Sequence, residues 1–401
     1  MHILVPPLYF YQMYKNIKLG RGKGYRIEQG HPWIYNNEIE CIDEGVENGE
    51  LVNVFNFKNQ FIGCAYFNAH SQISARILTR HQQTIDEDFF EQRIRLARTQ
   101  REALGYTSNY RLVFGEADQL PGLIIDKFGD YFVLQILTLG MEPWKQCITR
   151  ILQKIFFPKG IYERNDVPVR TLEGLHEQKG FLSKPFDTRI KIVEDNIRFC
   201  LDLAEGQKTG FFLDQKENRR VLQNICRNAD VIDCFTYTGS FALYAAHYGA
   251  TSICAYDVSE WAVKQANENA LLNKYNQCSF ECANAFDILP EKIKNGDQYD
   301  IVILDPPAFT KSRKNIHSAM RGYKEINLRG LKLTRSNGFL MTYSCSHFIS
   351  DELFFHTLRE AAHDAGRLIK RVQYLQQAKD HPALFDVPET QYLKGYLVIV
   401  E

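Results

Sequence analysis

A cysteine between two serines, Ser344-Cys345-Ser346, is the residue of this sequence best suited to covalent chemistry. It follows the apolar run Gly338–Tyr343, which has the composition of a strand, so the thiol is expected at a strand end. A thiolate that adds to C6 of a pyrimidine makes an enamine whose C5 can attack a methyl group on a sulfonium. Cys345 is therefore a candidate nucleophile. The alternative is an ordinary buried strand cysteine, the usual state of a lone Cys.

An aspartate followed by two prolines is expected beside this cysteine. Asp300–Leu304 is a short apolar strand, and Asp305-Pro-Pro307 ends it, because proline cannot continue a sheet ladder and stiffens the loop. Asp305 is then placed to hydrogen-bond or protonate N3 of the target base as well as to contact a cofactor. The alternative is a solvated aspartate in a strand-end turn. No residue of the sequence is assigned as the base that removes the C5 proton.

A cofactor site is predicted at the first strand, turn and helix of the C-terminal half. The apolar strand Val231–Phe235 leads into a turn with Gly239, whose missing Cβ lets the backbone approach a ligand. The next strand ends in Asp257, a carboxylate that can accept hydrogen bonds from both ribose hydroxyls of an adenosine. A dinucleotide-binding turn usually has three glycines that bind the pyrophosphate, and this turn has one. S-adenosylmethionine, which has no phosphate, therefore fits the turn better than NAD does.

A polar loop, Glu205–Arg219, precedes this site and contains Gly206 and Gly210. A helix is expected to begin within it, over Asp214 to Arg219. The loop can fold over the methionine end of the cofactor, or it can be a plain interdomain loop.

Strands and helices alternate from about residue 205 onward, and this order predicts a parallel, doubly wound α/β sheet that binds ligands at the carboxyl ends of its strands. The strands expected besides those above are Ser252–Asp257 and, just before the alternation begins, Asp195–Asp202. The expected helices are Phe241–Tyr248, Glu260–Leu272, Lys324–Thr334 and Ser350–Ala365.

The N-terminal part has two other patterns. Residues 1–80 hold short strand-like runs typical of a small β-rich module, namely Met1–Phe10, Leu51–Phe57, Phe61–Phe67 and Ile73–Leu78. Residues 81–190 predict a central α+β domain with a helix at Asp86–Ala103, a hairpin within Leu120–Leu139 and a helix at Met141–Phe156. Residues 191–401 then form the third domain.

Two glycine-rich motifs of the N-terminal module suggest a nucleic-acid contact. In Gly20-Arg-Gly-Lys-Gly-Tyr-Arg26, the glycines let the backbone and the neighbouring cations come close to phosphates. In Gly30-His-Pro-Trp-Ile-Tyr35, the rings of Trp33 and Tyr35 can stack on a base. The alternative is that Trp33 is a core residue and the glycines make turns. A basic stretch, Lys311–Arg335, carries eight Lys and Arg against one acid, Glu325, and is expected to bind phosphates unless it is a solvated helix face.

Composition excludes some classes of protein. The formal net charge is zero, so a nucleic acid would have to be held by a local patch. No apolar run reaches the roughly 18 residues that cross a bilayer, and the start lacks the features of a signal peptide. The ten cysteines form no CxxC pair or zinc motif, so reduced core cysteines in a cytoplasmic, metal-free protein are expected, except at Cys345.

Together these motifs resemble the ribosomal RNA large subunit methyltransferase I family, and the resemblance covers nearly the whole chain. It is carried by Gly30-His-Pro-Trp33, Cys234-Phe-Thr-Tyr-Thr-Gly-Ser-Phe241, Tyr256-Asp-Val-Ser259, Asp305-Pro-Pro307, Arg321-Gly-Tyr-Lys-Glu-Ile-Asn327, Ser344-Cys-Ser346 and Pro388-Glu-Thr-Gln-Tyr-Leu393. It implies a PUA RNA-binding domain over residues 1–80, the central domain over 81–190 and a Rossmann-like class I methyltransferase domain over 191–401. The implied activity is S-adenosylmethionine-dependent formation of 5-methylcytosine in 23S rRNA.

The resemblance also implies roles for individual residues. Cys345 and Asp305 are the catalytic residues. The residues implied to contact the cofactor are Lys208, Phe211, Asp214, Phe235, Tyr237, Gly239, Asp257, Ser259, Asn284, Ala285 and Asp305.

Three positions depart from the family pattern. Ser240 stands where a second glycine is usual, Asn284 stands where an aspartate usually faces the adenine, and His347-Phe348 replace a common Gly-Leu. Asn can both donate to and accept from the adenine edge, so cofactor binding is expected to survive.

Other activities stay open at this point. The same fold can methylate a base nitrogen, as on guanine, with Cys345 purely structural, or can serve as a non-catalytic RNA-binding or assembly protein. An NAD-linked dehydrogenase is disfavoured by the missing glycines. The oligomeric state is also open, with a homodimer as one arrangement.

Overall fold

The computed structural model describes residues 14–310 and 312–401, which form two compact units. The first unit contains the chain up to Arg189 together with Asp202–Phe211 and Lys379–Thr390, and the second contains Ile190–Leu201, Phe212–Ala378 and Gln391–Glu401. The strand expected at Met1–Phe10 lies outside the described residues. The division of the chain into three domains, with boundaries at residues 80 and 190, stays a prediction that these two units do not test.

The first unit begins with a six-stranded sheet in the order β2-β6-β5-β4-β1-β3. Its core contains Ile17, Val52, Val54 and Ile77 on neighbouring strands. The elements are β1 (Lys15–Leu19), α1 (Tyr25–Glu28), β2 (Trp33–Ile34), β3 (Ile39–Ile42), β4 (Leu51–Phe55), β5 (Phe61–Phe67) and β6 (Ala75–Thr79).

A second sheet of this unit has the order β11-β10-β9-β8-β7. Asp86 caps the helix α2 (Glu87–Ala103) by accepting a hydrogen bond from the Phe89 amide at 3.0 Å, which explains why this helix begins there. The apolar faces of α2 and α3 pack into one core with strands β7 to β10. The elements are α2 (Glu87–Ala103), β7 (Asn109–Phe114), β8 (Leu123–Phe128), β9 (Tyr131–Ile136), α3 (Lys145–Phe156), β10 (Gly160–Asn165), α4 (Val169–Leu172) and β11 (Gln178–Phe181).

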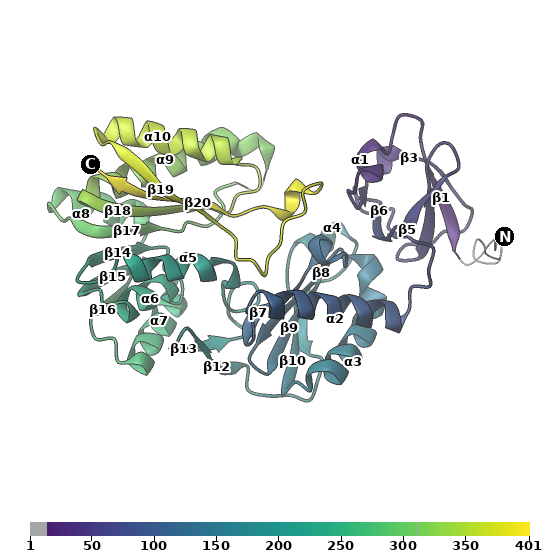
Figure 1. Ribbon diagram of the computed structural model, residues 1–401, viewed down its shortest axis with the longest axis horizontal. Helices are drawn as coiled ribbons and strands as arrows, with labels where there is room; N and C mark the ends of the chain where they lie inside the picture. Colours follow the sequence, from purple (N-terminus) through teal and green to yellow (C-terminus); the bar gives the residue numbers. More distant parts are fainter. Residues whose placement is uncertain (1–13, 311) are drawn as a thin grey trace, which may run out of the picture. The chain divides into compact units, whose positions relative to one another are not determined.

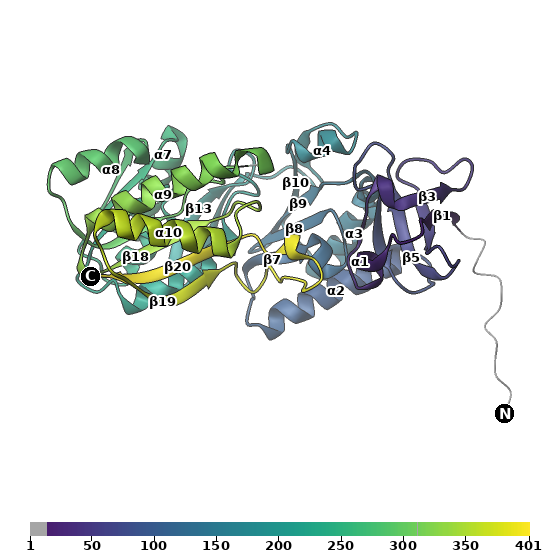
Figure 2. The ribbon, with the colours of Figure 1, turned by 90° about the horizontal axis from the view of Figure 1, so that it is seen from above.

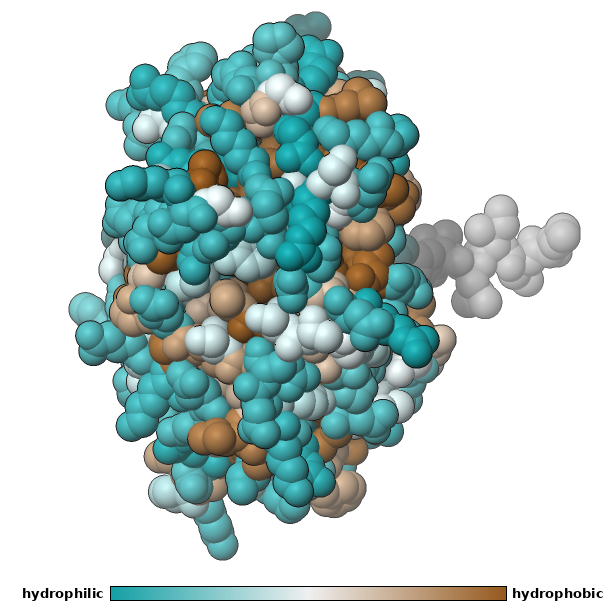
Figure 3. All heavy atoms as spheres, turned by 90° about the vertical axis from the view of Figure 1, so that its left-hand side faces the viewer, coloured by the Kyte–Doolittle hydropathy of each residue, from teal (hydrophilic) through white to brown (hydrophobic). Residues whose placement is uncertain are grey.

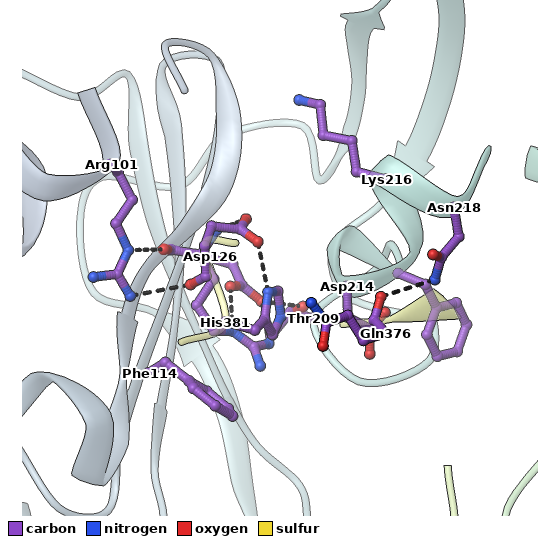
Figure 4. Close-up of polar contacts among 12 residues, drawn as sticks. Arg101, Phe114, Asp126, Thr209, Asp214, Lys216, Asn218, Gln376 and His381 are labelled. Carbon is purple, nitrogen blue, oxygen red and sulfur yellow. Dashed lines mark hydrogen bonds and ion pairs between the residues drawn. The ribbon is translucent and has the colours of Figure 1, made fainter. Parts of the chain in front are cut away.

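The late segment Lys379–Thr390 belongs to the first unit because buried polar contacts hold it there. Arg101 pairs with Asp118 at 2.5 Å and donates to the carbonyl of Asp380 at 3.0 Å. The Asp380 carboxylate accepts from the Arg111 amide at 2.8 Å and lies 2.7 Å from the Nδ1 atom of His381 (Figure 4). These charges are buried, and each is paired, as burial requires.

The second unit is built on a seven-stranded sheet in the order β16-β15-β14-β17-β18-β20-β19. The first five strands of that order are mutually parallel, and β20 runs antiparallel to both of its neighbours. The strands are β12 (Arg189–Glu194) and β13 (Ile197–Asp202), which form a separate ribbon, then β14 (Asp230–Cys234), β15 (Ser252–Asp257), β16 (Cys278–Cys282), β17 (Tyr299–Leu304), β18 (Thr334–Ser344), β19 (Ile369–Gln376) and β20 (Lys394–Val400).

Helices cover both faces of this sheet, α8, α9 and α10 on one side and α5, α6 and α7 on the other (Figures 1 and 2). Because both faces are covered, the central strands β14 and β17 are almost wholly buried, and most of their residues are apolar. The helices are α5 (Lys216–Arg220), α6 (Ser240–His247), α7 (Glu260–Asn273), α8 (Ala285–Lys294), α9 (Ile316–Leu333) and α10 (Asp351–Ala365). The doubly wound α/β fold is confirmed, and the chain order changes direction at β14, between β15 and β17. Carboxyl ends of the parallel strands meet at one edge, where such sheets bind ligands.

Three expectations need correction. The helix expected at Lys324–Thr334 begins eight residues earlier, at Ile316. The antiparallel pair β19 and β20 was not expected from the sequence. All ten cysteines are free, but Cys41 and Cys282 are exposed and so are not core residues.

Figure 3 shows one face of the second unit. Its face on the left of Figure 1 carries mainly hydrophilic residues, with hydrophobic ones in small separate groups (Figure 3). None of the helices that the structure describes has both the length and the apolar character needed to span a bilayer.

Candidate active site

The loop after β14 has a conformation that only certain residues tolerate. Phe235, Tyr237 and Gly239 have positive φ angles of 66°, 50° and 84°. A Cβ atom on Gly239 would lie 2.9 Å from Phe280 and 3.1 Å from Ala266. Glycine is therefore required there by the left-handed backbone and by packing against β16 and α7, and close approach of a ligand stays a prediction.

Asp257, at the end of β15, ties this loop to the next one. Its Oδ2 atom accepts a hydrogen bond from the Tyr237 amide at 2.9 Å, and its Oδ1 atom accepts one from the Ser259 amide at 2.9 Å. Ser259 in turn caps α7 by accepting from the Ala262 amide at 3.2 Å. Each carboxylate oxygen keeps a second lone pair, which is what a ribose hydroxyl would need.

The end of β16 joins the same edge. The Ala283 amide donates to the carbonyl of Asp257 at 2.9 Å. Asn284, an exposed residue, caps α8 by accepting from the Phe286 amide at 3.0 Å, and Ala285 is buried behind it. The structure therefore brings together Gly239 and Asp257, as their positions at strand ends predicted, with Ser259 and Asn284, which only the family resemblance indicated.

Asp233 is a site residue that the sequence analysis missed. It is fully buried on β14, and its Oδ2 atom accepts from the Thr236 hydroxyl at 2.5 Å and from the Ala242 amide at 3.2 Å. Burial raises the pKa of Asp233 to about 7, and the charge of Asp257 also raises it. The signal in the sequence was a single acid inside the apolar run Val231–Cys234.

Asp233 should make the stability of the fold depend on pH. Between about pH 4 and pH 7 the unfolded chain has lost this proton while the folded chain keeps it, so stability falls as pH rises and levels off above the folded pKa. Asp233→Asn, which can accept the same two hydrogen bonds, should gain stability over the wild-type protein as pH rises through this window, by about 4 kcal/mol at pH 7. Urea unfolding across pH 4–8 measures this difference. The matched control is the exposed Asp287→Asn, and an equal pH dependence in all three proteins would contradict the burial argument.

The loop fits a polar ligand such as S-adenosylmethionine. In the part of the chain that the structure describes, the Oδ1 atom of Asp233 and the Oγ1 atom of Thr238 are buried without a hydrogen-bond partner. Such atoms are costly unless something polar meets them. The amino, carboxylate and ribose groups of the cofactor are hydrogen-bonding groups of the kind such atoms need, and none of them requires the phosphate-binding glycines that the loop lacks.

Cys345 and Asp305 lie at the ends of adjacent parallel strands. Leu304 of β17 pairs with Thr342 of β18, and the thiol of Cys345 donates to the carbonyl of Pro306 at 3.8 Å. The Asp305 amide contacts the carbonyl of Cys234 at 3.4 Å, which joins this pair to the cofactor loop. Cys345 is partly exposed, whereas Ser344 and Ser346 are fully buried.

The polar loop before β14 is divided between the two units. Lys208 and Phe211 belong to the first unit, and their contact with the cofactor stays a prediction. Asp214 belongs to the second unit, is buried, and accepts from the Tyr392 hydroxyl at 2.6 Å. The helix after it is fixed by Asn218, which donates to the carbonyl of Gln376 at 3.0 Å (Figure 4).

Three of the seven described cations of the basic stretch are paired with acids. Lys324 pairs with Asp364 of α10 at 2.9 Å, and Arg335 pairs with Asp230 and Asp300. Arg329 pairs with Glu325 within α9. Lys311 lies outside the described residues. The exposed cations are Arg313, Lys314, Arg321 and Lys332.

The first glycine-rich motif of the first unit is largely exposed, whereas His31, Pro32 and Ile34 of the second are buried. Arg21, Lys23 and Tyr25 are exposed. Trp33 is half-buried and its indole N–H donates to Glu116 at 2.8 Å, and the guanidinium of Arg26 lies 5.1 Å from the ring centre of Tyr35. Stacking of these rings on a base stays a prediction.

Comparison with known proteins agrees with this geometry. Residues 17–80 match the family model of the PUA-like domain, and residues 178–398 match that of the S-adenosylmethionine-dependent methyltransferases. Ribosomal RNA large subunit methyltransferase I of Vibrio cholerae serotype O1 is 38% identical over 389 residues, which cover 95% of this chain and 98% of that protein. The protein of the same name from Shewanella denitrificans is 37% identical over 393 residues, with coverage of 96% and 99%.

Among solved structures, SMU.776 complexed with SAH has a TM-score of 0.83 at 18% identity, over 96% of this chain and 99% of that one, which is a likeness of fold. The expected PUA-like domain, methyltransferase fold and cofactor are thereby confirmed. The chain is an S-adenosylmethionine-dependent methyltransferase, and it belongs to the family of ribosomal RNA large subunit methyltransferase I.

Proposed function

We propose that this protein methylates C5 of a cytosine in 23S ribosomal RNA through a covalent adduct with Cys345. The relatives at 37–38% identity are named for the RNA of the large ribosomal subunit. The observation that carries the choice of base is the thiol itself. It is partly exposed and contacts the Asp305-Pro306 turn at the sheet edge, next to the loop that fits the cofactor.

The chemistry needs a nucleophile because C5 of cytosine is too poor a nucleophile to attack alone. The Cys345 thiolate forms a bond from Sγ to C6, and the electron pair of the C5–C6 double bond moves through C5 and C4 toward N3. A proton held between the Asp305 carboxyl and N3 neutralises the charge that develops there. S-adenosylmethionine, when bound, supplies a methyl group on a sulfonium for the enamine carbon C5. A base then takes the C5 proton, the Sγ–C6 bond breaks, and the double bond returns.

The RNA must present an unpaired base to this edge. A cytosine inside a helix cannot reach Cys345, so flipping or a single-stranded target is required. The exposed Arg313 and Lys314, just before α9, and Arg321, within α9, follow the Asp305-Pro-Pro307 turn in the sequence and can hold the flanking phosphates. Affinity for RNA should therefore fall as salt rises.

Mass mapping of 23S rRNA tests the proposed substrate. Cells that lack the gene should lose a single methyl group on one cytosine, and a plasmid copy of the gene should restore it. A methyl group lost from a guanine, or from a nitrogen of the base, would overturn the proposal while leaving the methyltransferase family intact.

A further inference from the structure

The turn that carries Cys345 is held by a buried lysine. Lys394 is the first residue of β20, opposite Ser344 in the antiparallel register of β18 and β20. Only 6% of Lys394 is exposed, and its ammonium donates to the carbonyl of Ser346 at 2.8 Å and to that of Ile349 at 2.7 Å. Both carbonyls belong to the turn after Cys345, so this one side chain fixes the path of that turn.

The charge of this ammonium is not cancelled by a neighbouring acid. Within residues 14–310 and 312–401, no carboxylate lies within ion-pair distance of Lys394. Burial lowers the pKa of Lys394 to about 8, and the negative charges of Cys345 and Asp351 act in the opposite direction. The interaction between two charges is mutual. Because the Cys345 thiolate stabilises the Lys394 ammonium, the ammonium also stabilises the thiolate.

A second buried side chain holds the turn from the other side. The hydroxyl of Tyr323, on α9, lies 2.9 Å from the Ser346 hydroxyl, and the Ser346 amide contacts the Ser344 hydroxyl at 3.4 Å. Tyr323 is fully buried. The turn therefore has little freedom, and the thiol between the two serines keeps its direction toward Pro306.

We propose that Lys394 is a positioning residue for Cys345, which fixes the turn that carries the thiol and supplies the positive charge that favours its thiolate. The proposal rests on the nucleophilic role of Cys345 given under the proposed function. It explains why a cation is kept in a buried position, where an apolar residue would cost less. On ionisation the Sγ–H bond gives its proton to water, and the negative charge stays on sulfur, within electrostatic range of the ammonium.

Acids and phenols are also close to this turn. A negative charge on Cys345 acts on the hydroxyl of Tyr323 on α9, and the charge of Asp305 acts on the hydroxyl of Tyr343, the residue before Ser344. Asp351, at the start of α10, accepts from the Tyr396 hydroxyl at 2.7 Å. His347 follows the thiol two residues later in the same turn.

Alkylation of Cys345 as a function of pH tests this proposal without any methylation assay. Iodoacetamide reacts with thiolates, and mass spectrometry of the Cys345 peptide separates this site from the exposed Cys41 and Cys282. In the native protein Cys345 should be half-ionised below about pH 8.5, the ordinary thiol value, and in urea it should return to that value. If Cys345 in the native protein were half-ionised at or above this ordinary thiol value, the proposal would be overturned.

Variants of Lys394 test the effect of its positive charge on the reactivity of Cys345. Lys394→Met should slow Cys345 alkylation at pH 7 about tenfold, the effect of one pKa unit, and Lys394→Arg should recover most of the rate. The matched control is the exposed Lys332→Met on α9, which should leave the rate unchanged. Since Lys394→Met leaves two buried carbonyls unpaired, its folding is checked by circular dichroism, and the native pH profile stands as the test if it fails to fold.

The outcomes separate the two proposals. An unchanged Cys345 pH profile in folded Lys394→Met would overturn the role of the lysine, whatever the substrate is. A shifted profile in a protein whose Cys345→Ala variant still methylates RNA would support the charge effect and overturn only the covalent mechanism.

Discussion

Cys345→Ala is expected to lose at least about a thousandfold in the rate of RNA methylation, because addition to C6 is the only route by which this site makes C5 nucleophilic. The rate is measured as labelled methyl groups transferred from S-adenosylmethionine to 23S rRNA. Cofactor affinity should stay within about twofold of the wild-type value, since Cys345 follows β18 whereas the cofactor loops follow β14 and β15. The loss would therefore lie in the chemical step.

The matched control for this variant is Cys41→Ala, which removes an exposed thiol of β3 in the first unit. It should methylate at the wild-type rate. If Cys345→Ala keeps a tenth or more of the activity, the thiol is structural, and methylation of a base nitrogen becomes the better explanation of the site.

Asp257→Ala should weaken S-adenosylmethionine binding roughly a hundredfold, about 2.7 kcal/mol. The carboxylate accepts hydrogen bonds from the amides of Tyr237 and Ser259 and so fixes both loops. In the predicted cofactor site its remaining lone pairs would also accept from the ribose hydroxyls. Isothermal calorimetry measures the dissociation constant, and the urea midpoint shows whether the variant is folded.

Asp287→Ala is the control for this second variant, because Asp287 is an exposed carboxylate of the same unit on α8. Its cofactor affinity should not change. A folded Asp257→Ala protein that binds the cofactor as tightly as the wild-type protein would show that the predicted adenosine site is elsewhere.

Local sequence patterns were sufficient to predict most elements of the fold. Phe61–Phe67 and Ser252–Asp257 are strands with the predicted bounds, since alternating or apolar runs between turn residues leave few other choices. The start of α9 was missed because its first turns combine Ile316 and Met320 with basic residues, so the helix resembled a charged loop. The strand β19 was missed because nearly all its side chains are exposed or half-buried, which removes the apolar pattern.

The site was predictable where a residue stands at a strand end, and not where a contact joins distant segments. Gly239, Asp257, Asp305 and Cys345 all follow predicted strands, so the rule for parallel sheets was enough to group them. Lys394 was not predictable, because its role depends on β20 lying antiparallel to β18, a pairing between residues 50 positions apart. Nothing local marks a lysine as the partner of a turn so far away in the chain.

The most direct test of the central claim is to trap the bond between Cys345 and the pyrimidine ring. An rRNA fragment with 5-fluorocytosine at the target position cannot release the C5 substituent as a proton, so the adduct should persist after methyl transfer. Digestion and mass spectrometry should then find the nucleotide attached to the peptide that contains Cys345, and only when S-adenosylmethionine is present to complete the step. Methylated RNA without any such adduct, or an adduct on another residue, would contradict the account.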